Sequence, residues 1–170
     1  MSMYVPMSRA HQSRTIKPRY ARTQATPQAV RLDPKWDGSR DIFPGSVLSR
    51  KDKGVVTLCD DKKAPAGLCG NFVAPVFGID EVRGGAGDWD MSMWVPGGDS
   101  IFAIYAPAFD AKADWAGACA LLDEGKAVYL KSSADGLLTT EAEPSTATEL
   151  SICRLVGMEG SKVILVAGLL

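Results

Sequence analysis

The sequence predicts a mainly β protein, built as a small β-barrel or β-sandwich with one short helix and an extended N-terminal arm. Three observations support this fold class: 17 glycines and 10 prolines among 170 residues, many short apolar runs, and a basic first segment. Glycine and proline at this density interrupt long helices, whereas short apolar runs between turns are typical of strands. With 46% hydrophobic and 23% charged residues, the chain has the composition of a globular protein with a buried core.

The first element is a basic arm, residues 1–35, which precedes a β-rich body, residues 36–170. The arm has a net charge of +6 and the body a net charge of −7. Prolines at positions 6, 18 and 27 interrupt any helix, so we expect an extended segment that binds the surface of a partner. The candidate binding residues of the arm are Arg9, Arg14, Lys17, Arg19 and Arg22.

Short strands alternate with turns through the rest of the chain. We expect strands at residues 46–48 and 54–59, followed by three hairpins. The hairpins pair residues 90–95 with 100–105, 127–131 with 137–140, and 150–156 with 162–167. Alternation in the first hairpin places Met91, Met93 and Val95 on one face.

One segment, residues 111–122, has a helical pattern. Trp115 and Cys119 are one helical turn apart, Asp110 is the expected N-cap, and Gly125 is the expected end of the helix. The sequence therefore predicts a single short helix between the first two hairpins.

Cysteine and histidine usage argues against a catalytic or metal site. We interpret the cysteines as buried thiols, because they lack the close paired spacing of zinc ligands: Cys59, Cys69, Cys119 and Cys153. The only histidine, His11, lies in the arm, so no Ser-His-Asp site is expected in the body. Asp88 and Asp90 are better explained as turn residues than as cation ligands. We expect no enzyme activity, cofactor, metal or small-molecule substrate.

Two tryptophans are candidate partner-binding residues. Trp36 lies beside an Asp-Gly pair and Trp89 beside a Gly-Asp pair, in expected loops where exposed aromatic side chains suit a protein interface. The longest apolar stretch, residues 163–170, is much shorter than the roughly 20 residues of a membrane-spanning helix. We therefore expect a protein partner and no membrane association.

Several short motifs follow one another in a recognisable order. The last third of the chain contains LDEGKAVYL (122–130), DGLL (135–138), ICRLVG (152–157) and KVILV (162–166). The upstream part contains FPGSVL (43–48), AGLCGNFVAP (66–75), GIDEV (78–82) and AIYAPAFD (103–110). This order resembles that of tailed-phage head decoration proteins, also called capsid cement proteins, and the upstream motifs resemble those of phages that infect actinobacteria.

The resemblance implies a structural virion protein, made in the host cytoplasm, that binds the outer capsid surface and bridges major capsid subunits. It also implies a homotrimer at three-fold or quasi-three-fold positions. Two alternatives remain: a nucleic-acid-binding module that uses the basic arm, and another virion protein such as a β protein of the tail. Nucleic acid is the less favoured partner, because the arm has only Tyr4 and Tyr20 for base stacking and the body is acidic.

Overall fold

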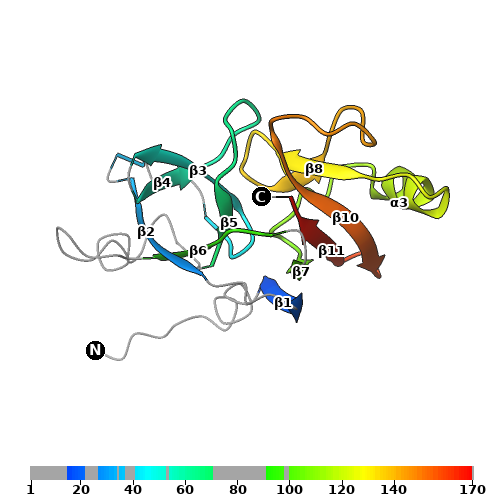
Figure 1. Ribbon diagram of the computed structural model, residues 1–170, viewed down its shortest axis with the longest axis horizontal. Helices are drawn as coiled ribbons and strands as arrows, with labels where there is room; N and C mark the ends of the chain where they lie inside the picture. The colour runs from blue at the N-terminus through cyan, green and yellow to red at the C-terminus, as the bar shows by residue number, and fades with distance from the viewer. Residues whose placement is uncertain are drawn as a thin grey trace.

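The computed structural model describes residues 15–21, 27–33, 35–36, 41–52, 54–70, 91–97 and 100–169, and it confirms the mainly β fold class. Five strands close a barrel, in the spatial order β2 (Gln28–Leu32), β4 (Val55–Leu58), β3 (Val47–Asp52), β5 (Gly67–Cys69) and β6 (Met91–Trp94). Six strands form an antiparallel sheet beside the barrel, in the order β1 (Ile16–Ala21), β7 (Ser100–Tyr105), β11 (Val163–Gly168), β10 (Ser151–Glu159), β8 (Tyr129–Ser132) and β9 (Leu138–Thr140). Figure 1 shows the helix α3 (Trp115–Asp123) on the side of the sheet that is away from the barrel.

The barrel contains a β3–β4 hairpin and is closed by β2, which precedes the other barrel strands in the chain. Gly54 has a φ of 68°, which permits the tight turn between β3 and β4. Strand β2 pairs in parallel with β4 and antiparallel with β6. Its two alternate apolar side chains, Val30 and Leu32, are buried with Leu48, Val56 and others inside the barrel. Each of the five described barrel strands is therefore paired on both sides.

The sheet contains the two later hairpins that the sequence predicts. Strand β8 pairs with β9, and β10 pairs with β11. Strand β7 then joins β11 on one side and β1 on the other. One face of the sheet is apolar and buried, with the paired residues Phe102, Val166 and Leu155 in successive strands.

The barrel and the sheet share one hydrophobic core. Val47, Cys59 and Leu68 come from the barrel region, yet they pack in the same buried cluster as the inner face of the sheet. The ring of Trp94 at the end of β6 lies edge-on to Phe102 of β7, with 5.6 Å between the ring centroids. The two units are therefore joined by apolar packing as well as by the chain.

The first predicted hairpin is wrong, although its two strands exist; of the residues predicted on one face, Met91 and Met93 are buried and Val95 is half-buried. Strand β6 pairs with β2 and β5 in the barrel, whereas β7 pairs within the sheet. Gly97 accepts a hydrogen bond from the Ser100 amide, 3.0 Å away, and residues 98 and 99 of the predicted turn lie outside the described residues. However, Pro96 lies against the end of β11, where a Cβ on Gly168 would come within 2.0 Å of the Pro96 carbonyl oxygen. Strands β6 and β7 therefore belong to different units, although they follow each other in the chain.

The helix begins later than the sequence suggests. Its N-cap is Asp114, whose side chain accepts a hydrogen bond from the Gly117 amide at 2.9 Å. The expected cap, Asp110, instead accepts hydrogen bonds from the Lys112 amide and the Thr139 hydroxyl. Gly125 has a φ of 77° and follows the helix, as predicted.

The four cysteines are free thiols. Cys59, Cys69 and Cys153 are buried, as predicted, whereas Cys119 on α3 is half-buried. Burial raises the pKa of the Cys153 thiol far above its ordinary value, and it also raises the pKa values of Cys59 and Cys119.

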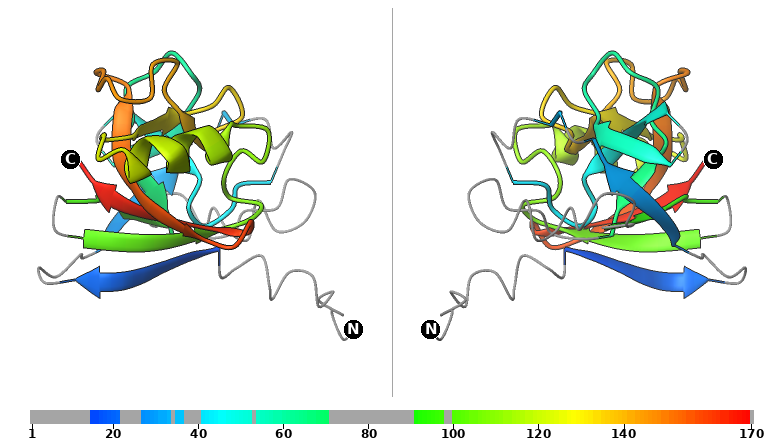
Figure 2. Two further views of the ribbon diagram at one scale, coloured as in Figure 1. Left: turned by 90° about the vertical axis from the view of Figure 1, so that its right-hand side faces the viewer. Right: turned by 90° about the vertical axis from the view of Figure 1, so that its left-hand side faces the viewer.

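Two strands lie inside the basic segment 1–35. Figure 2 shows β1 along the lower edge of the sheet beside β7, while β2 belongs to the barrel wall. Pro18 is compatible with β1 because β1 is an edge strand, where one side of the backbone needs no partner. The expected boundary at residue 36 thus separates β1 and β2 from the strands with which they pair.

Candidate partner-binding surface

The structure describes three of the seven residues that the sequence predicts to bind a partner. Lys17 and Arg19 lie together on β1, and Trp36 lies at the barrel. The other four lie outside the described residues: Arg9, Arg14, Arg22 and Trp89. The described part of the predicted site is therefore divided between the edge of the sheet and the barrel.

Lys17 and Arg19 both contact their own sheet. The Lys17 ammonium lies 5.4 Å from the centre of the Tyr105 ring. Arg19 donates two hydrogen bonds to the Glu159 carboxylate, at 2.9 and 2.7 Å. The pKa of Arg19 is raised, first by its hydrogen bond with Tyr105 and then by the charge of Glu159. These contacts attach β1 to the sheet, and both cations remain exposed at its edge.

Trp36 is half-buried and packs against the barrel core. Its amide donates a 2.9 Å hydrogen bond to the carbonyl oxygen of Asp33. The Asp33 carboxylate accepts hydrogen bonds from the Lys51 ammonium at 2.6 Å and the Lys35 amide at 3.0 Å. The Lys51 hydrogen bond is the main reason why the pKa of Asp33 is lowered. Trp36 is therefore part of an ordered corner of the barrel, with only part of its ring available to a partner.

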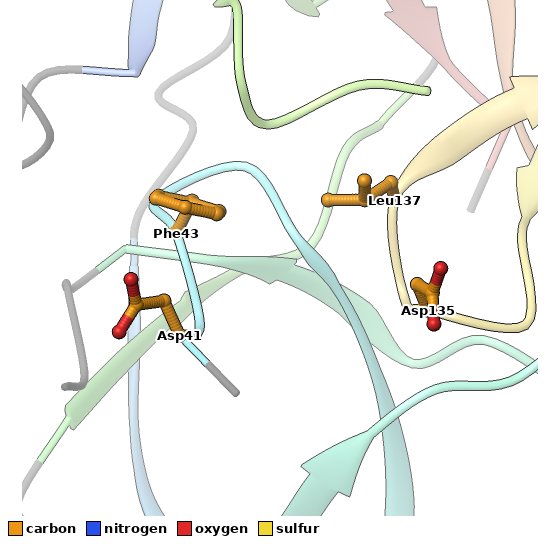
Figure 3. A pocket seen from close by; sticks show the side chains of 4 residues that line it. All are labelled: Asp41, Phe43, Asp135 and Leu137. Atoms are coloured by element: carbon orange, nitrogen blue, oxygen red, sulfur yellow. The ribbon is translucent and has the colours of Figure 1, made fainter. Parts of the chain in front are cut away.

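A hollow of about 310 Å³ lies between the barrel and the β8–β9 turn. Figure 3 shows Phe43 and Leu137 directed toward each other from its two walls, with Asp41 beside Phe43, Asp135 beside Leu137 and the two carboxylates directed away from each other. The walls are connected, because the Val47 amide donates a 2.7 Å hydrogen bond to the Gly136 carbonyl oxygen. The hollow combines two apolar side chains with two carboxylates.

A second hollow, of about 370 Å³, lies between the end of α3 and β10. The pairing of β10 with β11 shifts by one residue between Leu155 and Gly157, and the extra residue, Val156, is 44% exposed. The cations Arg154 and Lys126 lie on the lining of this hollow, which is otherwise apolar apart from backbone groups. Its full lining consists of Leu122, Gly125, Lys126, Ala127, Arg154, Leu155 and Val156.

Neither hollow is recognisable in the sequence as a site. Phe43 precedes one predicted turn and Asp135 lies in another. Only the fold brings these two turns together. Val156 lies in a predicted strand, and the sequence does not mark the shift in register at this position. Within the described ranges there is no group of three or more side chains able to hold a metal ion, and no helix long and apolar enough to cross a membrane.

Comparison with known families gives a match over nearly the whole chain. A family model described as phage cement protein matches residues 2–167, which is nearly the whole chain. The match therefore includes the basic segment, the barrel and the sheet. No curated protein and no solved structure matches the chain.

Proposed function

The chain belongs to the phage cement protein family, and we propose that it binds the outer surface of a phage head and bridges neighbouring major capsid subunits. Membership of the family indicates a structural, capsid-stabilising role in the virion, without enzyme activity. The family match over residues 2–167 is the observation that supports the proposal most strongly, because it covers both folded units and the basic segment.

The charge distribution supports a role for the basic segment in attachment. The segment has a net charge of +6, whereas the other residues have a net charge of −7. The segment therefore favours a negatively charged surface, and the body does not. We assign the capsid contacts to Arg9, Arg14, Lys17, Arg19 and Arg22, together with Trp36 and Trp89. Lys17 and Arg19 remain exposed at the edge of the sheet, where a capsid surface can reach them.

The proposal includes a homotrimer at three-fold or quasi-three-fold positions of the head. Several linked copies strengthen attachment, because each further contact of an already bound assembly forms at a high effective concentration. The motifs at residues 43–48 and 66–75 resemble those of decoration proteins from phages of actinobacteria, which supports such a host.

Co-sedimentation with expanded, undecorated capsids tests the proposed function. We expect wild-type protein to bind saturably and to raise the temperature at which the particles rupture. The variant R9Q/R22Q should bind more weakly, because two cations of the segment are lost, and added salt should weaken wild-type binding in the same direction. The matched control K62Q/K112Q removes two exposed cations of the body and should bind like wild type.

The outcomes separate the alternatives. Failure of wild-type protein to bind capsids would refute the cement function, whereas equal binding by R9Q/R22Q would remove these arginines from the contact. Binding to naked DNA, with a steep dependence on salt and none to capsids, would favour the nucleic-acid alternative. Electron cryomicroscopy of decorated particles then measures the number of copies at each three-fold position.

A further inference from the structure

The six-stranded sheet has a second face that is also apolar. Every residue of β11 is apolar or glycine, although only alternate side chains, such as Ile164 and Val166, belong to the shared core. A strand with one face in solvent normally alternates apolar with polar residues, because successive side chains point to opposite sides of the sheet. The other side chains of β11 lie on the face opposite the core: Val163, Leu165 and Ala167.

Strand β7 continues this outer face. Leu165 pairs with Ala103 and Val163 pairs with Tyr105, and cross-strand partners lie on the same side of a sheet. The smaller Ala103 is buried, whereas Leu165, Val163 and Tyr105 are half-buried. Among the described residues, neither apolar cluster of the core includes any of these four side chains. The outer face of β7 and β11 therefore carries apolar surface that no described element of the core covers.

Cations flank the apolar surface on both sides. From β1, Lys17 pairs with Ala103, and from β10, Arg154 pairs with Ala167. Arg154 is exposed and has no hydrogen bond or ion pair with another residue of the described part of the chain. The carboxylate of Glu159, which pairs with Val163, is already bonded to Arg19. The outer face is thus basic, whereas residues 36–170 together carry a net charge of −7.

The irregularity in β10 adds an apolar projection beside Arg154. The register shift leaves Val156 without a partner in β11 and 44% exposed. Arg154 and Val156 also line the 370 Å³ hollow at the end of α3. A partner that covers the outer face can therefore place a side chain in this hollow, next to the Arg154 guanidinium.

The charge of the outer face determines which partner suits it. Residues 1–14 of the same chain contain no Asp or Glu, so their arginines are repelled by Lys17 and Arg154. A second copy packed face to face would bring the same cations against each other. The aliphatic side chains of Leu165 and Val156 gain by burial against a protein but offer nucleic-acid bases no stacking platform. The matching surface belongs to another protein and has apolar side chains bordered by carboxylates.

We propose that the outer face of β7, β10 and β11 is the surface with which the folded body docks on the capsid. This assignment rests on the proposed function, and it adds Arg154, Val156 and Leu165 to the contact residues. Lys17 lies at the β1 side of the same face, so a capsid surface that reaches Lys17 extends across the sheet to Arg154. Apolar contact in the middle and charge pairs at the sides are the usual arrangement of a protein interface.

Reversal of one charge tests the basic side of the face. In co-sedimentation of the full-length protein with expanded, undecorated capsids, R154E should bind about tenfold more weakly, because a carboxylate then opposes the carboxylates of the partner. The matched control K62E reverses an exposed cation in the loop after β4 and should bind like wild type.

Introduction of a charge tests the apolar part of the face. V156D should also weaken binding by about tenfold, because docking would bury an unpaired carboxylate. The control A64D adds the same charge in the exposed loop after β4 and should have no effect. Melting curves check that each variant is folded, and R154E, at an exposed position, carries the test if V156D is not.

Hydroxyl-radical footprinting locates the covered side chains directly. On capsids, the oxidation of Tyr105, Val156 and Leu165 in wild-type protein should fall several-fold relative to the free protein. The half-buried Leu150, in the loop before β10, is the internal control and should be oxidised equally in both states.

The outcomes separate this assignment from the proposed function. A wild-type protein that does not bind capsids would refute the proposed function and this occupant of the face together. Normal binding by R154E and V156D, with no protection of the three side chains, would refute the docking face alone. Protection that appears on concentrating the free protein would assign the face to a second copy. Loss of DNA binding in R154E with unchanged capsid binding would assign it to nucleic acid. Either of these last two results contradicts the proposal.

Discussion

At the scale of single residues, two glycines with the same backbone conformation have different surroundings. Gly136 and Gly125 have φ values of 78° and 77°, in the region that residues with a Cβ rarely adopt. A Cβ on Gly136 would lie 2.4 Å from a methyl carbon of Leu58, whereas a Cβ on Gly125 would have no neighbour within 4 Å. Gly136 therefore meets both a conformational and a packing requirement, and Gly125 only the conformational one.

Replacing each glycine by alanine separates these two requirements. We expect G125A to lower the free energy of unfolding by about 1 kcal/mol, the cost of the left-handed conformation. G136A should cost about 1–3 kcal/mol more, because the added methyl group overpacks the contact with Leu58. Urea denaturation of both variants measures the difference. Equal losses for the two variants would show that Leu58 yields without cost.

At the scale of elements, β1 is an edge strand of the described sheet. It pairs only with β7, and the pairing shifts in register between Pro18 and Tyr20. The exposed contacts of Lys17 with Tyr105 and of Arg19 with Glu159 supplement the backbone pairing. Because both contacts are accessible to solvent and ions, the attachment of β1 should weaken as salt is added.

Hydrogen exchange measures how firmly β1 is attached. In R19Q we expect several-fold faster amide exchange in residues 16–21 and in the edge of β7 that they cover, with little change in β10 and β11. E159Q should have the same effect, and the double variant should add little, because both substitutions remove one interaction. K112Q, which removes an exposed cation from a loop, is the matched control. No change in R19Q would mean that backbone pairing alone holds the strand.

At the scale of the whole molecule, the shared core predicts that barrel and sheet unfold together. Leu68 lies on a barrel strand but packs in the cluster of the sheet, whereas Leu32 packs only in the cluster of the barrel. Both side chains are fully buried. A substitution that disrupts the packing of one cluster therefore also disrupts the packing of the other.

Leucine-to-alanine substitutions at these two positions test the coupling. L68A and L32A should each lower the free energy of unfolding by about 2–5 kcal/mol, because each leaves a cavity in a packed core. Tryptophan fluorescence and far-ultraviolet circular dichroism should give a single, coincident transition in both variants. Two separate transitions in L32A would contradict the coupling, because they would show a barrel that unfolds on its own.

The sequence by itself determined the features that depend on neighbours along the chain. Alternation and turn residues identified the hairpins β8–β9 and β10–β11, the spacing of Trp115 identified a short helix, and the order of the motifs identified the family. Turn chemistry and side-chain periodicity are local, so these features follow from a few consecutive residues.

Only the tertiary structure decided which strands lie together. The residues after β6 predict a hairpin as the later turn residues do, yet β6 pairs with β2 and β5, and Pro96 packs against Gly168 at the end of β11. The same is true of the hollow between Phe43 and Leu137, whose walls are far apart in the sequence and are joined through Val47 and Gly136. Contacts between distant segments depend on how whole units pack, and local residue patterns contain no information about that packing.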